Sequence, residues 1–358
     1  MHAPDRIVHR EVRLSRALAS AILRAMKKSG CALLAVFLAL CASLFFNLVL
    51  LALFGATEAE GLALRKLSAP ALSEVVLEDG AAGAGKIAVI PVQGVIYTDT
   101  ATEWGTSMVD DIKGALQTAL DDDEVKAVVL AVDSPGGEVT ASDIIYNDVV
   151  RVQKEKPVVV AMSSLAASGA YYIACGADWI VANPTTFTGS IGVIIQSLNY
   201  EGLFDKVGLD AVVFKSGKFK DMLSGSRPLT PEESAYVERM VKQVYERFLG
   251  IVASSRRLEA DKLRDNVADG RILTGEDAKA AGLVDQLGYI EDAYDKAREL
   301  AEAPEAGVIR YQSGLNFQRL LRLMGAGAQS KVEVQLAPGP AFRMQPGRAY
   351  LLPEFYAW

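Results

Sequence analysis

Histidine is almost absent from this sequence. The two histidines of the chain, His2 and His9, lie in a short basic segment ahead of a long apolar run. Imidazole is the commonest general base near neutral pH, so chemistry in the rest of the chain must use another group. The absence excludes a Ser-His-Asp triad and any metal site with histidine ligands. A serine activated by a lysine remains open.

Cysteine is also scarce. Cys31 and Cys41 lie in the apolar run, and Cys175 stands alone in the remainder of the chain. Without a partner, Cys175 forms no disulfide within that region. Its apolar, small-residue surroundings predict a small buried hydrophobic side chain.

Positive charge is concentrated at the N-terminus. Residues 1–28 contain seven Arg and Lys against two acidic residues, whereas the rest of the chain has 30 basic and 42 acidic residues. An acidic main part argues against nucleic acid as a partner. We therefore treat 1–28 as a separate basic tail.

Residues 29–57 contain no charged side chain. The run exceeds the roughly 20 apolar residues that a membrane helix needs. A cleaved secretory signal is the alternative, but this apolar run is longer than a signal sequence requires. The sequence predicts one N-terminal transmembrane helix in the cytoplasmic (inner) membrane. Positive charge ahead of it places the tail in the cytoplasm and the main domain on the extracytoplasmic, periplasmic side.

Glycine and alanine at 79–85 end a stretch, 58–85, that is typical of a flexible linker. A domain is predicted over 86–312. Residues 313–358 form a C-terminal tail that ends in the apolar sequence YLLPEFYAW. The tail is either disordered or packed on a neighbouring subunit, and its apolar end favours packing.

Short apolar runs alternate with helical patterns in the domain. This alternation predicts an α/β fold with a mainly parallel sheet. The expected strands are 86–96, 126–132, 157–162, 179–182, 191–195 and 210–214, and the expected helices are 107–120, 141–153, 230–256, 275–281 and 289–302.

Hydroxyl and glycine residues follow several of these strands. DSPGGEV (133–139) contains paired glycines that let backbone N–H groups approach a ligand, and SSLAASGAYYIACGAD (163–178) holds a serine among small residues. FTGSIGVI (187–194) offers two further hydroxyls. Each segment is also typical of an ordinary turn or of close packing on a sheet.

Three lysines occur in FKSGKFKDM (214–222). A lysine acts as a base only when its ammonium form is destabilised, for example by burial. Solvation is the usual state of such a cluster, and the sequence does not determine which of the three is buried.

Together these blocks resemble a known family. DSPGG, AASGAYYIA, TGSIGVI, SGKFKD and GRILTGEDAKAAGLVD occur in the order found in signal peptide peptidases of the S49 serine protease family. The resemblance spans about residues 86–290 and implies a crotonase/Clp-protease-like fold. One set of motifs resembles the short form of the family, whose members assemble as homo-oligomeric rings that complete the active sites between subunits.

The resemblance implies a Ser/Lys dyad. By position, Ser168 is the nucleophile and Lys220 the general base. The backbone N–H groups of Gly137 and Gly169 form the oxyanion hole, and Ser190 orients the lysine. No metal or cofactor is implied.

The implied activity is a membrane-anchored serine endopeptidase that degrades remnant signal peptides after signal peptidase has released them. Its partners are then apolar peptides, including membrane segments, and further copies of the chain. Alternatives are a protease dedicated to one membrane protein, a crotonase-type acyl-CoA enzyme and a non-catalytic scaffold. The predicted extracytoplasmic placement argues against the CoA enzyme, because CoA is a cytoplasmic cofactor.

Overall fold

The computed structural model describes residues 40–47, 72–98, 107–313 and 350–351. The chain divides into two units, Met1–Ala69 and Pro70–Trp358. In the first unit, residues 40–47 are helical. Among the described residues, no helix is long and apolar enough to cross a membrane. The expected basic tail 1–28 and most of the expected span 29–57 lie outside the described residues.

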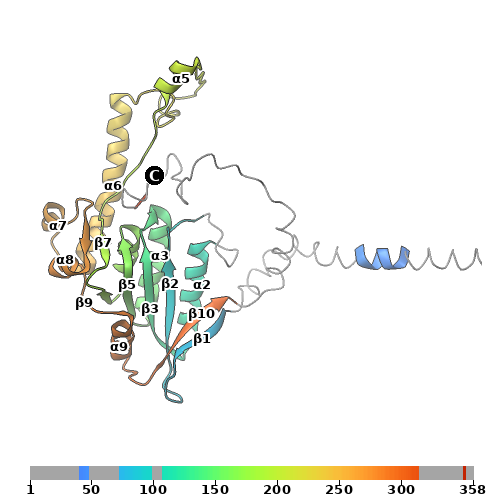
Figure 1. Cartoon of the computed structure of the whole chain (residues 1–358), viewed down its shortest axis with the longest axis vertical. Coiled ribbons are helices and arrows are strands. Elements are labelled where there is room, and N and C mark those ends of the chain that lie inside the picture. The colour runs from blue at the N-terminus through green and yellow to red at the C-terminus, as the bar shows by residue number, and fades with distance from the viewer. Residues whose placement is uncertain (1–39, 48–71, 99–106, 314–349, 352–358) are drawn as a thin grey trace, which may run out of the picture. The chain divides into compact units, whose positions relative to one another are not determined.

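A nine-stranded, mainly parallel sheet forms the second unit, as the sequence predicts (Figure 1). Its main path runs β1-β10-β2-β3-β5-β6-β9, and β7 joins β5 to β8. β1 is antiparallel to β10 and β8 to β7, while the other pairs are parallel. The strands are β1 (Leu72–Glu78), β2 (Lys86–Gln93), β3 (Val125–Ser134), β5 (Val158–Ala167), β6 (Trp179–Ala182), β7 (Phe187–Gly189), β8 (Ile272–Thr274), β9 (Gln286–Leu287) and β10 (Gly307–Ser313).

Helices cover both faces of this sheet, which explains why its central strands are apolar throughout. Val128 and Leu130 face a core formed with α2, α3, α4 and α6, while Val129 and Val159 face a second core under α9. The helices are α2 (Met108–Asp121), α3 (Val139–Gln153), α4 (Gly169–Ala174), α5 (Glu201–Val207), α6 (Pro231–Arg256), α7 (Ala260–Asn266), α8 (Gly275–Ala280) and α9 (Ile290–Leu300).

Two short strands lie off the main sheet. β4 (Gly137–Glu138) begins at the second glycine of the pair, and β11 (Tyr350–Leu351) pairs with it in antiparallel fashion. β11 is the only described part of the tail beyond residue 313. The apolar C-terminal tail therefore contributes at least one packed segment to the domain, in the same chain.

The structure corrects three expectations. The predicted linker 58–85 contains β1, so the domain begins before residue 86. The strand expected at 191–195 instead forms earlier in the chain, as β7, and residues 191–195 lie after its end. The expected strand 210–214 does not form, because no neighbouring strand in the described part of the chain pairs with it, and these five residues are exposed.

An arm, defined here as residues 198–230, projects beyond the start of α6 (Figure 1). It contains α5 and the lysine cluster. Only the C-terminal half of α6 packs into the core, through Phe248, Leu249 and Val252. Thr230 and Glu233 form the capping box predicted at the start of this helix. The arm thus extends from a helix that is anchored at its far end.

Candidate active site

Ser168 lies between a strand and a helix. β5 ends at Ala167 and α4 begins at Gly169, so the serine occupies the turn at the carboxyl end of a central strand. Its backbone has φ 56° and ψ −113°, a conformation that costs a non-glycine residue about 1–3 kcal/mol. The N–H of Ser168 donates to the carbonyl of Gly189 at 2.8 Å, and its carbonyl accepts from Tyr172 N at 2.8 Å. These bonds hold the strained turn in place.

The hydroxyl of Ser168 is buried and has no hydrogen-bond partner among the described residues. The residue is 1% exposed. A buried hydroxyl without a partner costs roughly 1–3 kcal/mol, so such groups are rare in folded proteins. Ser168 thus combines a strained backbone with a buried hydroxyl that has no hydrogen-bond partner, which indicates a functional role rather than a structural one.

Gly137 and Gly169 bring their backbones together beside this serine. A Cβ added to Gly169 would lie 3.1 Å from Gly137 N, and one added to Gly136 would lie 2.5 Å from Gly169 N. Gly136 has φ +94°, which favours glycine. Side chains at these positions would fill the space between the two N–H groups. The structure therefore brings together three of the predicted site residues.

The N–H of Gly137 points away from its neighbouring strand segment. Ile96 donates to the Gly136 carbonyl, and Glu138 donates to the Ile96 carbonyl, each at 2.8 Å. Because polar groups alternate along an extended chain, the N–H of Gly137 is directed to the opposite edge. That edge is the one along which β11 pairs, with Leu351 opposite Gly137.

Ser190 is a second buried serine with positive φ, at 49°. Its N–H donates to the Arg271 carbonyl at 2.8 Å, and Gly189 before it accepts from Ser168. Among the described residues, the Ser190 hydroxyl makes no hydrogen bond. The backbone thus links this predicted lysine-orienting residue directly to Ser168.

Lys220 lies in the arm and is exposed, so this single chain does not bring it to Ser168. Of the three clustered lysines, Lys215 pairs with Asp221 at 2.8 Å and Lys218 pairs with Glu232. In the part of the chain that the structure describes, the Lys220 side chain makes no ion pair or hydrogen bond. Lys220 is therefore the one of these three lysines whose side chain is unpaired among the described residues.

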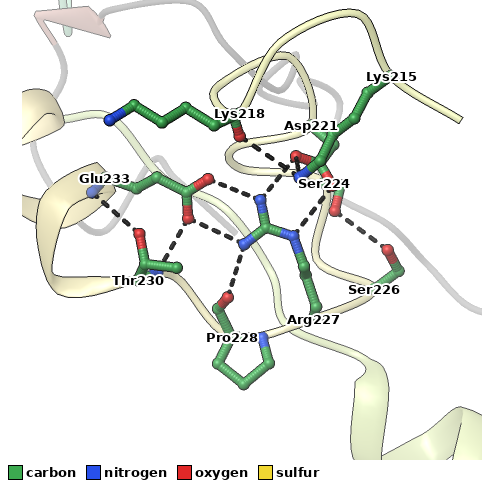
Figure 2. Close-up of polar contacts among 9 residues, drawn as sticks. All are labelled: Lys215, Lys218, Asp221, Ser224, Ser226, Arg227, Pro228, Thr230 and Glu233. Carbon is green, nitrogen blue, oxygen red and sulfur yellow. Dashed lines mark hydrogen bonds and ion pairs between the residues drawn. The ribbon is translucent and has the colours of Figure 1, made fainter. Parts of the chain in front are cut away.

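Arg227 binds Asp221, the residue after Lys220, and Glu233 of α6 (Figure 2). Its guanidinium group binds Asp221 at 2.7 and 3.0 Å and Glu233 at 2.6 and 2.9 Å. Hydrogen bonds from Arg227 lower the pKa of Asp221 and hold that of Glu233 at about 2. The residue after Lys220 is therefore tied to the first turn of α6. The sequence analysis did not find this network, because no sequence motif indicates that Asp221, Arg227 and Glu233 form ion pairs.

Cys175 is buried, as predicted, and burial raises the pKa of its thiol to about 12. A thiol with so high a pKa is a poor nucleophile at neutral pH. Among the described residues, no group of His, Cys, Asp and Glu side chains is arranged to hold a metal. Ser168 is the buried nucleophile that the geometry favours.

A strained serine at a strand-to-helix turn, next to two converging glycine N–H groups, is typical of hydrolases that act through a serine ester and an oxyanion. Family models place the chain within that class. The model of peptidase family S49 matches residues 150–304, and that of Clp protease matches residues 95–185.

Individual relatives agree. A protein from Enterococcus faecium, assigned as the signal peptide peptidase SppA, is 38% identical over 246 residues, which cover 68% of this chain and 71% of that protein. A protein assigned as a protease, MJ0651 of Methanocaldococcus jannaschii, is 44% identical over 53% of this chain and 61% of its own length. The chloroplastic serine protease SPPA of Arabidopsis thaliana is 34% identical over 62% of this chain and 33% of its own. The chain belongs to peptidase family S49, a family of serine peptidases with a Clp-protease-like fold.

Proposed function

We propose that this peptidase cleaves peptide bonds with Ser168 as nucleophile and Lys220 as general base. Neutral Lys220 takes the proton of the Ser168 hydroxyl as Oγ attacks the carbonyl carbon, and the oxyanion forms beside the N–H groups of Gly137 and Gly169. Ser190 orients the lysine amine. Water then hydrolyses the acyl-enzyme with Lys220 again as base. The observation that carries the proposal is the buried, unpartnered hydroxyl of Ser168 next to these two glycines.

Lys220 is supplied by a neighbouring copy of the chain. Its own loop projects from the domain, and the arm exposes an apolar surface that includes Val212, at 75%, and Phe214, at 96%. Residues 210–214, with the sequence DAVVF, have the composition of a strand but no strand partner among the described residues. Packing of each arm on the next copy covers this surface and completes a ring of equivalent sites.

The substrates are remnants of signal peptides and other apolar membrane segments. One relative bears the name of a signal peptide peptidase. An apolar groove of about 1000 Å³ starts at Ile191, next to Ser190, and runs along α6, where Val237, Val241 and Tyr245 line it. Residues 29–57 anchor the enzyme in the cytoplasmic membrane, with the N-terminal tail in the cytoplasm and the domain on the extracytoplasmic side. This location brings the site close to its substrates.

The direct test measures cleavage of a fluorogenic, apolar signal-peptide-like substrate by the full chain in detergent. Ser168→Ala and Lys220→Ala are each expected to lower kcat by several orders of magnitude, because dyad members act as a unit. Lys218→Ala is the matched control, since Lys218 already pairs with Glu232 on the surface. Activity that survives Lys220→Ala but not Lys218→Ala or Lys215→Ala would assign the base to another lysine. If no variant loses peptidase activity, the Ser168/Lys220 dyad is refuted.

A further inference from the structure

One carboxylate joins three helices of the domain. Asp143 of α3 accepts a hydrogen bond from the Tyr172 hydroxyl of α4 at 2.5 Å and another from Nη2 of Arg247, in α6, at 2.7 Å. Nε of Arg247 lies 3.2 Å from both Asp143 Oδ1 and the Tyr172 hydroxyl. Burial and the hydrogen bond to Asp143 raise the pKa of Tyr172, so its hydroxyl stays protonated and donates. The three side chains therefore form a closed polar network.

Each of these helices is continuous with one part of the proposed catalytic machinery. α3 starts directly after β4, which holds Gly137, and α4 starts directly after Ser168. The carbonyl of Ser168 also accepts a hydrogen bond from Tyr172 N at 2.8 Å. α6 starts at the end of the arm that carries Lys220. The network thus connects the segments that hold the oxyanion hole, the nucleophile and the base.

Apolar packing and polar bonds constrain α6 in different ways. Phe248 of α6 is fully buried and packs on the Tyr172 ring, with the two ring centroids 5.0 Å apart. Apolar contact is non-directional, so it fixes how closely α6 approaches α4 more than it fixes the tilt of the helix. The hydrogen bonds of a guanidinium group are directional. Arg247 precedes Phe248, so its bonds to Asp143 fix the tilt where α6 leaves the core.

α6 connects this network to the arm over a long distance (Figure 1). Between the capping residue Glu233 and Phe248, no residue of the helix is buried. At a rise of 1.5 Å per residue, Pro231 at the start of the helix lies about 24 Å from Arg247. A tilt of about 5° at Arg247 therefore moves the start of the helix, and the arm with it, by about 2 Å. A misplacement of about 1 Å is enough to lower a reaction rate by about 10²-fold.

We infer that Arg247 is a positioning residue, which acts through Asp143 and Tyr172 to fix the direction in which α6 carries Lys220 into the neighbouring copy. Arg247 thus belongs to the copy that supplies the lysine, and the serine that it affects lies in the next copy. An exposed ion pair contributes little to stability, and 58% of the Arg247 side chain is exposed. Its main effect is therefore on the chemical step rather than on folding. This inference rests on the proposed function.

Mixtures of inactive full-length chains assign the effect to one copy. When Ser168→Ala and Lys220→Ala chains exchange subunits in detergent, a productive interface takes its lysine from the first chain and its serine from the second. Arg247→Ala is added to the Ser168→Ala chain in one mixture and to the Lys220→Ala chain in another. Recovered cleavage of an apolar fluorogenic peptide is expected to fall about tenfold in the first mixture and to stay unchanged in the second. Arg151→Ala is the matched control, because the ion pair of Arg151 with Asp148 lies within α3.

Steady-state kinetics of the single variant give a second readout. Arg247→Ala in the otherwise native chain is expected to lower kcat about tenfold and to leave KM unchanged, because Lys220 acts in the chemical step. The thermal midpoint is expected to change little. Arg151→Ala is expected to match the native chain in all three quantities.

Three results would overturn the inference while leaving the proposed function intact. They are an equal fall in both mixtures, a fall only when Arg247→Ala is in the chain that supplies the serine, and no fall in either. A loss of kcat that follows a matching loss of thermal midpoint would likewise assign Arg247 a structural role. If the mixture without Arg247→Ala recovers no activity, although subunit exchange is verified, the shared active site of the proposed function is refuted and the inference with it.

Discussion

The N–H of Ser168 donates to the carbonyl of Gly189 at 2.8 Å. This bond joins the strained serine turn to the residue that precedes Ser190, so both hydroxyl residues depend on the backbone of one glycine. Gly189 itself has φ +74°, a region that side chains disfavour.

Gly189→Ala is expected to destabilise the protein by about 1–2 kcal/mol, the cost of a left-handed conformation for an L-residue. The added Cβ would also lie 3.3 Å from the Arg271 carbonyl. A backbone shift that relieves this contact would move the Gly189 carbonyl, which accepts the hydrogen bond from Ser168 N–H. We therefore expect kcat/KM to fall as well. Denaturant unfolding and substrate cleavage measure the two effects.

Gly114→Ala serves as the control for Gly189→Ala. Gly114 lies in α2 with no atom within 4 Å of an added Cβ, so alanine there is expected to stabilise the chain by about 0.5–1 kcal/mol. Equal behaviour of the two variants would contradict the role given to Gly189.

Gly169→Ala tests the oxyanion hole. Its Cβ would lie 2.5 Å from Ser142 Oγ and 3.1 Å from Gly137 N. The first contact affects stability and the second affects catalysis, so a second substitution separates them. Adding Ser142→Ala, which removes Oγ and keeps a good helix former in α3, is expected to restore much of the thermal midpoint but not kcat, which stays about 10²–10³ lower, as on loss of an oxyanion donor. Recovery of kcat in the double variant would show that the space between the two N–H groups is not used.

The ion pairs of the arm weaken at acid pH, where their carboxylates become protonated. Arg227 holds the pKa of Glu233 at about 2, below its ordinary value of 4.5. A lowered pKa stabilises the fold above pH 4.5, and that contribution disappears as the pH falls toward 2. Glu233→Gln keeps an acceptor for Thr230 N–H but removes the charge.

Thermal midpoints from pH 7 to pH 2 check this interpretation. The variant is expected to melt below the wild type at pH 7, and the two midpoints should converge at the acid end. A difference that persists unchanged at pH 2 would assign the effect to the capping hydrogen bonds instead.

Much of the fold was predictable from sequence because its elements carry local signals. Alternating apolar runs and helices gave the parallel sheet, and Thr230, Pro231 and Glu233 marked the start of α6. Ser168, Gly137 and Gly169 were found through ordered motifs, and the structure brings these three together. The strain at Ser168 was not predictable, since no local sequence signal marks a positive φ at a serine.

Other features depend on partners that a sequence does not identify. Residues 210–214 have strand composition, but a strand requires a neighbour, and the residues that the structure describes provide none. β1 was hidden in a stretch that resembled a linker, because only pairing with β10 makes it a strand. β11 is two residues long, too short for any periodic signal, so its position beside Gly137 emerges only in the folded chain.

The measurement that tests the account most directly mixes two inactive proteins. Ser168→Ala retains Lys220, and Lys220→Ala retains Ser168, so subunits exchanged in equal amounts place an intact serine beside an intact lysine at about a quarter of the interfaces. We predict that the mixture regains about that fraction of wild-type activity, while each variant alone stays inactive. No recovery, with subunit exchange shown by differently tagged copies, would contradict an active site completed by a neighbouring chain.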